Sequence, residues 1–65
     1  MQIFVNGEII QTEVITLSLL LEELDYEGNW LATAVNSEVI PIEERSEFIL
    51  HEGDKIEILS PMQGG

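Results

Sequence analysis

The sequence predicts an α+β fold in which a mixed sheet of four to five strands packs on one main helix. Three observations predict it. The first apolar segment ends at Asn6-Gly7, the pair favoured in tight type I′ hairpin turns. Leucines then recur at helical spacing from Leu17 to Leu24. Near the end, residues 55–59 follow the polar and apolar alternation of a half-buried strand.

The N-terminal part reads as a β-hairpin. Residues 2–5, Gln-Ile-Phe-Val, are rich in the β-branched and aromatic types that favour strands. After the turn at Asn6-Gly7, residues 8–13 return as a second strand. We therefore expect two antiparallel strands at the start of the chain.

The main helix begins after Thr16, a residue type suited to the N-cap. Leu19 lies off the apolar stripe and is expected to be half exposed. Gly28-Asn29 is expected to end the helix or the loop after it. The stripe itself, at positions i, i+3, i+4 and i+7, consists of Leu17, Leu20, Leu21 and Leu24.

Short elements fill the second half of the chain. Pro41 stops ladder pairing, because it lacks a backbone N–H group. Residues 42–48 are long enough for one or two helical turns, which we expect there. The other expected elements are a strand at 31–35, a turn at Asn36-Ser37, a strand at 39–40, a turn at Gly53-Asp54 and the final strand at 55–59.

This element order predicts helical segments on one face of a small sheet. If the last strand lies beside the first and runs the same way, the sheet is mixed, which is the ubiquitin-like β-grasp arrangement. We expect residues 1–59 to form this domain. Residues 60–65 carry no strand or helix pattern and are expected to form a flexible C-terminal tail ending in Gly-Gly.

Length and composition limit the class of protein. A chain of 65 residues allows one domain. It has no cysteine and one histidine, so neither a disulfide nor a structural zinc is expected to stabilise it. The first residues lack the features of a signal peptide, and no apolar run is long enough to span a membrane. We therefore expect a cytoplasmic protein.

Acidic residues greatly outnumber basic ones. Thirteen Asp and Glu residues face only Arg45 and Lys55, which gives a formal net charge of -11. Nucleic acids and anionic lipid surfaces would repel such a chain, so neither is an expected partner. Partners should present basic surfaces or bind through apolar contact, and the free chain is expected to be monomeric. For most of the acidic residues, solubility alone is a sufficient explanation.

The pair Gly64-Gly65 is the most informative feature of the tail. A terminal glycine has no Cβ beside its carboxylate, so an enzyme can draw the chain end into a narrow slot. Six extended residues reach roughly 20 Å, far enough to enter another protein's active site. The alternatives are a frayed terminus without function and a remnant of expression.

Few other residues are candidates for a site. His51 has no second His or Cys with which to bind a metal, and adjacent glutamates such as Glu22-Glu23 point apart on a helix. We expect no catalytic residue and no metal site. Phe4, Leu59 and Met62 are candidate partner-binding residues. Phe4 and Leu59 are out of step with the core positions of their strands and should lie on the face away from the helix. The alternative is a partly exposed rim of the core.

The chain resembles the ThiS family of sulfur carrier proteins of thiamin biosynthesis over essentially its whole length. Each matching segment is weak alone, but their order, spacing and termination at Gly-Gly make the set fairly specific. The segments are Ile3-x-Val5-Asn6-Gly7, Thr16-Leu17-x-x-Leu20-Leu21-x-x-Leu24, Ala34-Val35-Asn36, Val39-Ile40-Pro41, Glu52-Gly53-Asp54-x-Ile56 and Gly64-Gly65.

The resemblance implies a protein co-substrate rather than an enzyme. An adenylating (ThiF-like) enzyme would use ATP to activate the Gly65 carboxylate, and Gly64 would give access to it. A sulfur donor such as a cysteine desulfurase would then supply the sulfur of a thiocarboxylate, which thiazole synthase consumes. No cofactor would be bound to the chain itself.

Three alternatives share parts of this interpretation. The small subunit of molybdopterin synthase would use the same tail chemistry in another pathway, although the short chain and compact segment 42–48 favour the thiamin type. A ubiquitin-like modifier would form isopeptide bonds through Gly65. A plain acidic binding module would have no chemistry at Gly65, and its activity would survive removal of this residue.

Overall fold

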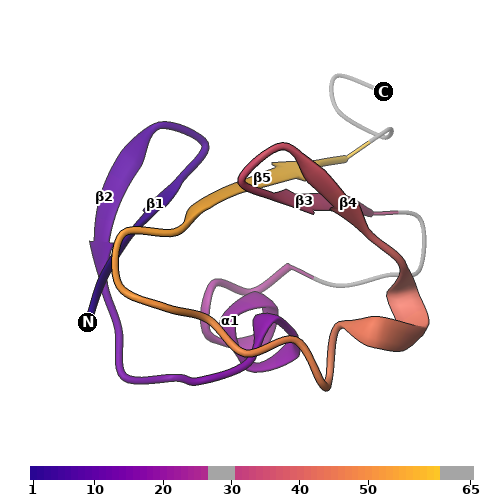
Figure 1. Ribbon diagram of the computed structural model, residues 1–65, viewed down its shortest axis with the longest axis horizontal. Helices are drawn as coiled ribbons and strands as arrows, with labels where there is room; N and C mark the ends of the chain where they lie inside the picture. Colours follow the sequence, from indigo (N-terminus) through magenta and orange to yellow (C-terminus); the bar gives the residue numbers. More distant parts are fainter. Residues whose placement is uncertain (27–30, 61–65) are drawn as a thin grey trace.

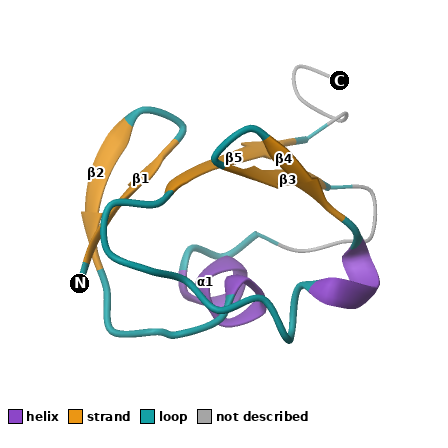
Figure 2. Cartoon of the chain, viewed as in Figure 1, coloured by secondary structure: helices purple, strands orange, loops and turns teal. Residues whose placement is uncertain are grey.

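The computed structural model describes residues 1–26 and 31–60, which form a five-stranded sheet with a helix across one face (Figures 1 and 2). The strand order in the sheet is β2-β1-β5-β3-β4. The elements are β1 (Gln2–Val5), β2 (Glu8–Gln11), α1 (Leu17–Glu23), β3 (Ala32–Val35), β4 (Glu38–Ile40), the 3-10 turn η1 (Ile42–Glu44) and β5 (Lys55–Leu59).

Two tight turns build the outer hairpins of the sheet. Asn6 and Gly7 join β1 to β2 with φ angles of 51° and 87°. Asn36 and Ser37 join β3 to β4 with φ angles of 52° and 74°. Positive φ at both central residues defines the type I′ turn, whose twist suits a two-residue hairpin. The turn expected at Asn6-Gly7 is confirmed, and the second hairpin uses the same geometry.

The last strand lies in the centre of the sheet. It runs parallel to β1, with Phe4 opposite Lys55 and Val5 opposite Ile56. On its other side it runs antiparallel to β3, with Ala32 opposite Leu59. The mixed sheet packed on one main helix is therefore confirmed, with five strands and the β-grasp arrangement.

Helix α1 begins as the sequence predicts. The backbone N–H of Leu19 donates to the Thr16 hydroxyl at 3.2 Å, which makes Thr16 the N-cap. Leu17 and Leu20 are fully buried, and Leu21 is 7% exposed. Leu19 is 43% exposed, in agreement with its place off the stripe.

The helix ends earlier than Gly28-Asn29, and these two residues lie outside the described part of the chain. Its stop signal is Asp25, whose φ of 65° lies in the left-handed region. The N–H of Tyr26 then donates to the Leu21 carbonyl at 2.9 Å, and that of Asp25 to the Glu22 carbonyl at 3.1 Å. These two bonds form a Schellman motif, which usually has glycine at the position that Asp25 fills here.

Other boundaries also differ from the expected ones. Strand β2 ends at Gln11 rather than at residue 13, because the chain then turns toward α1. Residues 42–48, where one or two helical turns were expected, contain one, the 3-10 turn η1. Strand β3 begins at Ala32 rather than at residue 31, and β4 begins at Glu38 rather than at residue 39.

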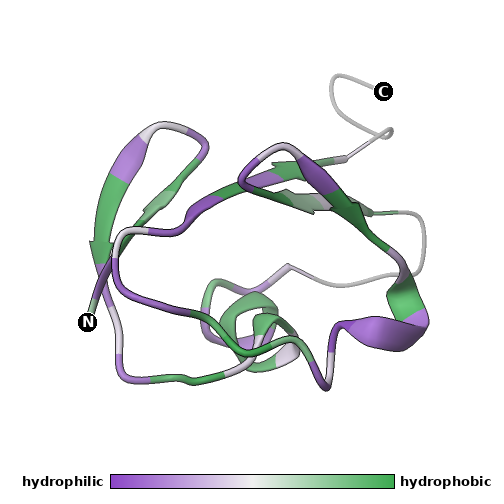
Figure 3. Cartoon of the chain, in the orientation of Figure 1, coloured by the Kyte–Doolittle hydropathy of each residue, from purple (hydrophilic) through white to green (hydrophobic). Residues whose placement is uncertain are grey.

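The core lies between the sheet and α1, where Figure 3 shows apolar residues along the helix and the facing strands. Aliphatic side chains from every strand except β2 and from α1 fill it, and Ile10 of β2 packs against its edge. Its buried members are Ile3, Val5, Leu17, Leu20, Leu21, Leu31, Val35, Ile40, Leu50, Ile56 and Ile58.

Candidate functional site

The described part of the candidate site is the end of β5 and the outer face of the sheet. Leu59 is the last residue of β5, and Ser60 is the last described residue. Gly64, Gly65 and Met62 lie outside the described residues. Because β5 is the central strand, the segment that contains them follows the middle of the sheet rather than an edge.

Alternation along β5 decides which side chains face outward. Ile56 and Ile58 are buried against α1, whereas Lys55, Glu57 and Leu59 lie on the opposite face and are exposed. Leu59 is 66% exposed and lies opposite Ala32 of β3. The structure therefore confirms that Leu59 lies on the face away from the helix, as predicted.

Phe4 lies on the same outer face, on β1, and is half-buried. It lies opposite Lys55, four residues before Leu59 along β5, so the two side chains start roughly 13 Å apart. They line different hollows. One is formed by Phe4, Gly7, Lys55, Ile56 and Glu57. The other, of about 300 Å³, is formed by Ala32, Thr33, Ala34, Ser37, Val39, Glu57 and Leu59.

Two apolar residues of this face were not expected there. Val39 of β4 is 73% exposed and lies opposite Ala34, so it borders the hollow that contains Leu59. Ile9 of β2 is 60% exposed and lies opposite Phe4. The position of both residues follows from cross-strand pairing. The sequence could have predicted it only by counting residue pairs outward from the two type I′ turns, which gives the register of each hairpin.

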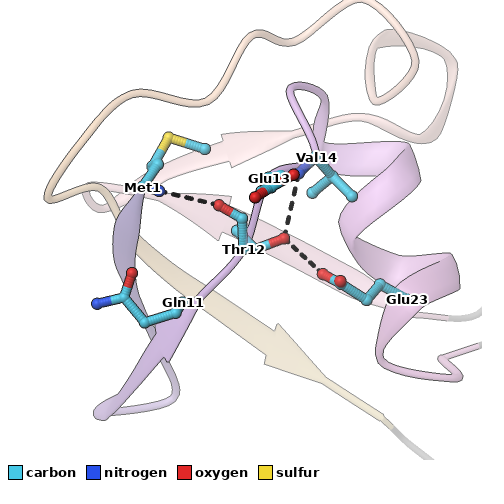
Figure 4. Close-up of a pocket in the computed structure, with 6 residues that line it drawn as sticks. All are labelled: Met1, Gln11, Thr12, Glu13, Val14 and Glu23. Carbon is cyan, nitrogen blue, oxygen red and sulfur yellow. Dashed lines mark hydrogen bonds between the residues drawn. The ribbon is translucent and has the colours of Figure 1, made fainter.

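A larger hollow lies elsewhere, between the end of β2 and the C-terminal turn of α1 (Figure 4). Its volume is about 500 Å³, and it is lined by Met1, Gln11, Thr12, Glu13, Val14 and Glu23. The Thr12 hydroxyl donates to the Glu23 carboxylate and accepts from the Val14 N–H. The N-terminal ammonium donates to the Thr12 carbonyl at 3.1 Å. These bonds tie β1 and α1 to the segment that follows β2.

The remaining ionisable candidates lie on the surface. His51 is exposed, and its backbone N–H donates to the Asp54 carboxylate at 2.9 Å. Glu22, Glu23, Glu43 and Glu44 are likewise exposed. Within residues 1–26 and 31–60, no three His, Asp or Glu side chains gather in a way that could hold a metal ion. Among the same residues, no helix has the length and apolar character needed to cross a membrane.

Comparison with known proteins gives consistent matches. The model of the ThiS family matches residues 1–65. The sulfur carrier protein ThiS of Escherichia coli K12 is 33% identical over 66 residues, with all of both chains covered. A crystal structure of the thiamine biosynthesis protein ThiS from Geobacter metallireducens superposes with a TM-score of 0.84 at 26% identity, again over all of both chains. A solution structure of a thiamine biosynthesis protein from the same organism gives 0.82 at 26% identity, covering this chain fully and 88% of the other.

Proposed function

Because the chain belongs to the ThiS family, the sulfur carrier proteins of thiamine biosynthesis, we propose that the carboxylate of Gly65 is the group that carries the sulfur. As a member of this family the chain is a protein co-substrate and not an enzyme. The observation that carries the proposal is that the family match extends through Gly64-Gly65, which follow Leu59, the last residue of the central strand, by five and six residues in the sequence.

The chemistry takes two steps. A carboxylate oxygen of Gly65 attacks the α-phosphorus of ATP, and pyrophosphate leaves, which gives an acyl adenylate. A sulfur nucleophile then attacks the acyl carbon, and AMP leaves as the C–O bond to the phosphate breaks. Hydrosulfide gives the thiocarboxylate directly, whereas a persulfide gives an acyl disulfide, from which a thiol releases the thiocarboxylate by reducing the S–S bond. Gly64 and Gly65 have no side chains, so both attacks meet little steric hindrance. The chain contains no cysteine, and this route needs no thiol of its own.

The partners follow from these steps. An adenylating enzyme of the ThiF type would catalyse the first one, a donor such as a cysteine desulfurase would supply the sulfur, and thiazole synthase would consume the thiocarboxylate. The outer face of the sheet is the proposed docking surface for the adenylating enzyme. Its apolar residues Phe4, Leu59 and Val39 lie on β1, β5 and β4, and Met62 follows Leu59 by three residues in the sequence.

Deletion of Gly65, or its replacement by valine, tests the proposal. We expect the domain to fold normally, because the described core uses no residue beyond Ile58. We expect adenylation to be lost, since deletion moves the carboxylate out of register and valine crowds the acyl carbon. The measurement is ATP–pyrophosphate exchange with the cognate activating enzyme. Intact mass of the wild-type product should show one oxygen replaced by sulfur. Normal exchange by the folded, truncated protein would contradict the proposal.

The same assay tests the docking surface with a matched pair of variants. Leu59 and Ile15 are similarly exposed, at 66% and 58%, but Ile15 precedes α1 and lies off the sheet. We expect Leu59→Asp to raise the KM for the carrier about tenfold or more, as loss of an apolar anchor does. Ile15→Asp should leave it unchanged. Equal effects of the two substitutions would mean that the enzyme recognises the tail without this face.

A further inference from the structure

β1 ends at Val5, and the side chain of Asn6 then continues the hydrogen bonding with β5. The Asn6 backbone N–H donates to the Ile56 carbonyl at 2.9 Å. Two residues further along β5, the Ile58 N–H donates to Asn6 Oδ1 at 2.9 Å, and Asn6 Nδ2 donates to the Ile58 carbonyl at 3.2 Å. A side-chain amide has the same donor and acceptor as a peptide group, so it takes the place of the next residue of β1.

We propose that Asn6 is a positioning residue for the activation of Gly65, because its amide holds the residue from which the last strand leads into the tail. This inference rests on the proposed function. Ile58 is followed by Leu59, the last residue of β5, and then by residues 60–65. The Asn6 bonds therefore fix where the ordered sheet ends on this side and how many residues separate it from the terminal carboxylate.

The physical effect is on the register of the carboxylate. Without the Asn6 amide, both backbone groups of Ile58 on the β1 side lose their partners among the described residues. Ile58 and Leu59 are then held in the sheet by their pairing with β3 alone, so they detach more often, and the segment that links the docked sheet to the carboxylate becomes longer. A longer link lowers the effective concentration of the carboxylate at the ATP site.

A matched control exists in the other hairpin. Asn36 also begins a type I′ turn, and its Oδ1 accepts from the Lys55 N–H at 3.0 Å. Its backbone N–H donates to the Lys55 carbonyl at 2.7 Å, and its Nδ2 donates to Asp54 Oδ1 at 3.0 Å. Asn36 thus holds Lys55, at the beginning of β5, in the way that Asn6 holds Ile58, which lies three residues further along the strand.

The test compares Asn6→Gly with Asn36→Gly. Glycine tolerates the positive φ at each position and keeps the type I′ turn, while it removes the amide. Amide hydrogen exchange should rise roughly tenfold or more at Ile58 in Asn6→Gly, as loss of two hydrogen bonds allows. The rate at Ile58 should be unchanged in Asn36→Gly.

Kinetics of ATP–pyrophosphate exchange then separate positioning from stability. For Asn6→Gly we expect kcat to fall about 3- to 10-fold, because the carboxylate is less often in place, and KM to rise less than in Leu59→Asp, because the Leu59 side chain is still present. A merely unfolded fraction would lower the concentration of active carrier, which raises the apparent KM and leaves kcat at saturation unchanged. Asn36→Gly should leave kcat at the wild-type value.

Asn6→Asp provides an intermediate and a safeguard if the glycine variant does not fold. Aspartate keeps the acceptor for the Ile58 N–H and loses the donor to the Ile58 carbonyl. Its kcat should lie between those of wild type and Asn6→Gly. The inference is overturned if kcat is unchanged in the Asn6 variants, or if the Asn36 variant lowers it equally. In either case, exchange by the wild-type protein would still support the proposed function. No exchange by the wild-type protein would overturn the proposed function and this inference with it.

Discussion

Arg45 shows how one residue can bind several elements together. It is one of two basic side chains in the sequence, yet it is buried, with 7% of its surface exposed. Its Nε donates to the Thr33 hydroxyl at 3.1 Å, and a terminal nitrogen of its guanidinium donates to the Leu31 carbonyl. The Thr33 hydroxyl in turn donates to the Ile40 carbonyl at 3.0 Å. The guanidinium therefore links the segment after η1 to β3 and, through Thr33, to β4.

Replacement of Arg45 by alanine should lower the free energy of unfolding by about 2–4 kcal/mol, because buried hydrogen-bond acceptors lose a charged donor. Arg45→Met should cost nearly as much, since methionine restores apolar volume but no donor. Lys55→Ala, at the exposed basic residue, should change it by less than about 0.5 kcal/mol. Urea denaturation measures all three. A stable Arg45→Met variant would show that volume, and not hydrogen bonding, is what Arg45 contributes.

At the candidate site, the outward orientation of Phe4 and Leu59 was predictable because it depends only on the period of a strand. The Asn6 amide was not. Its turn type follows from the Asn6-Gly7 pair, but its side-chain bonds depend on the parallel pairing of β1 with β5, which is 52 residues away at Ile58. Local sequence carries no signal for a contact of this range.

At the level of elements, the strands were predicted best where a strong turn fixed one end. The hairpin at Asn6-Gly7 and the final strand were correct, and the N-cap at Thr16 was correct. Of the two roles expected for Gly28-Asn29, the end of the helix is not the one they have, because Asp25 fills the left-handed position that glycine usually takes; the end of the following loop lies outside the described residues. Residues 42–48 contain one of the one or two helical turns expected there, a 3-10 turn, and the buried Arg45 follows it.

The helix stripe gives a prediction for α1. Leu20→Ala should destabilise the domain by about 2–5 kcal/mol, because Leu20 is fully buried and its loss leaves a cavity. Leu19→Ala is the matched control on the same helix; since Leu19 is 43% exposed, it should cost less than about 1 kcal/mol. Thermal melts of both variants test this. Equal melting temperatures for Leu20→Ala and wild type would mean that the helix face is wrong.

At the scale of the whole molecule, charge dominates. The formal net charge is -11, and burial of Arg45 leaves Lys55 as the one exposed Lys or Arg. The negative charges on such a surface repel one another in the folded state. At 0.1 M salt, the repulsion between exposed charges more than about 10 Å apart is largely screened.

The melting temperature should therefore rise with sodium chloride up to near physiological strength, by about 2–5 °C. A variant in which the exposed Glu43 and Glu47 are both replaced by glutamine should show a smaller rise, because it carries less charge. Differential scanning calorimetry across a salt series measures both. A flat or falling curve for the wild-type protein would remove self-repulsion as a determinant of its stability.

The central position of β5 also affects when the domain can form. Synthesis proceeds from the N-terminus, so the strand that joins the two hairpins is made last. Until Lys55–Leu59 has left the ribosome, β1 and β3 have no neighbour between them, and a chain released before Lys55 cannot close the sheet. Closure of the sheet thus waits for the synthesis of β5. An activating enzyme that docks on the closed sheet would meet finished carriers and would not engage prematurely terminated ones.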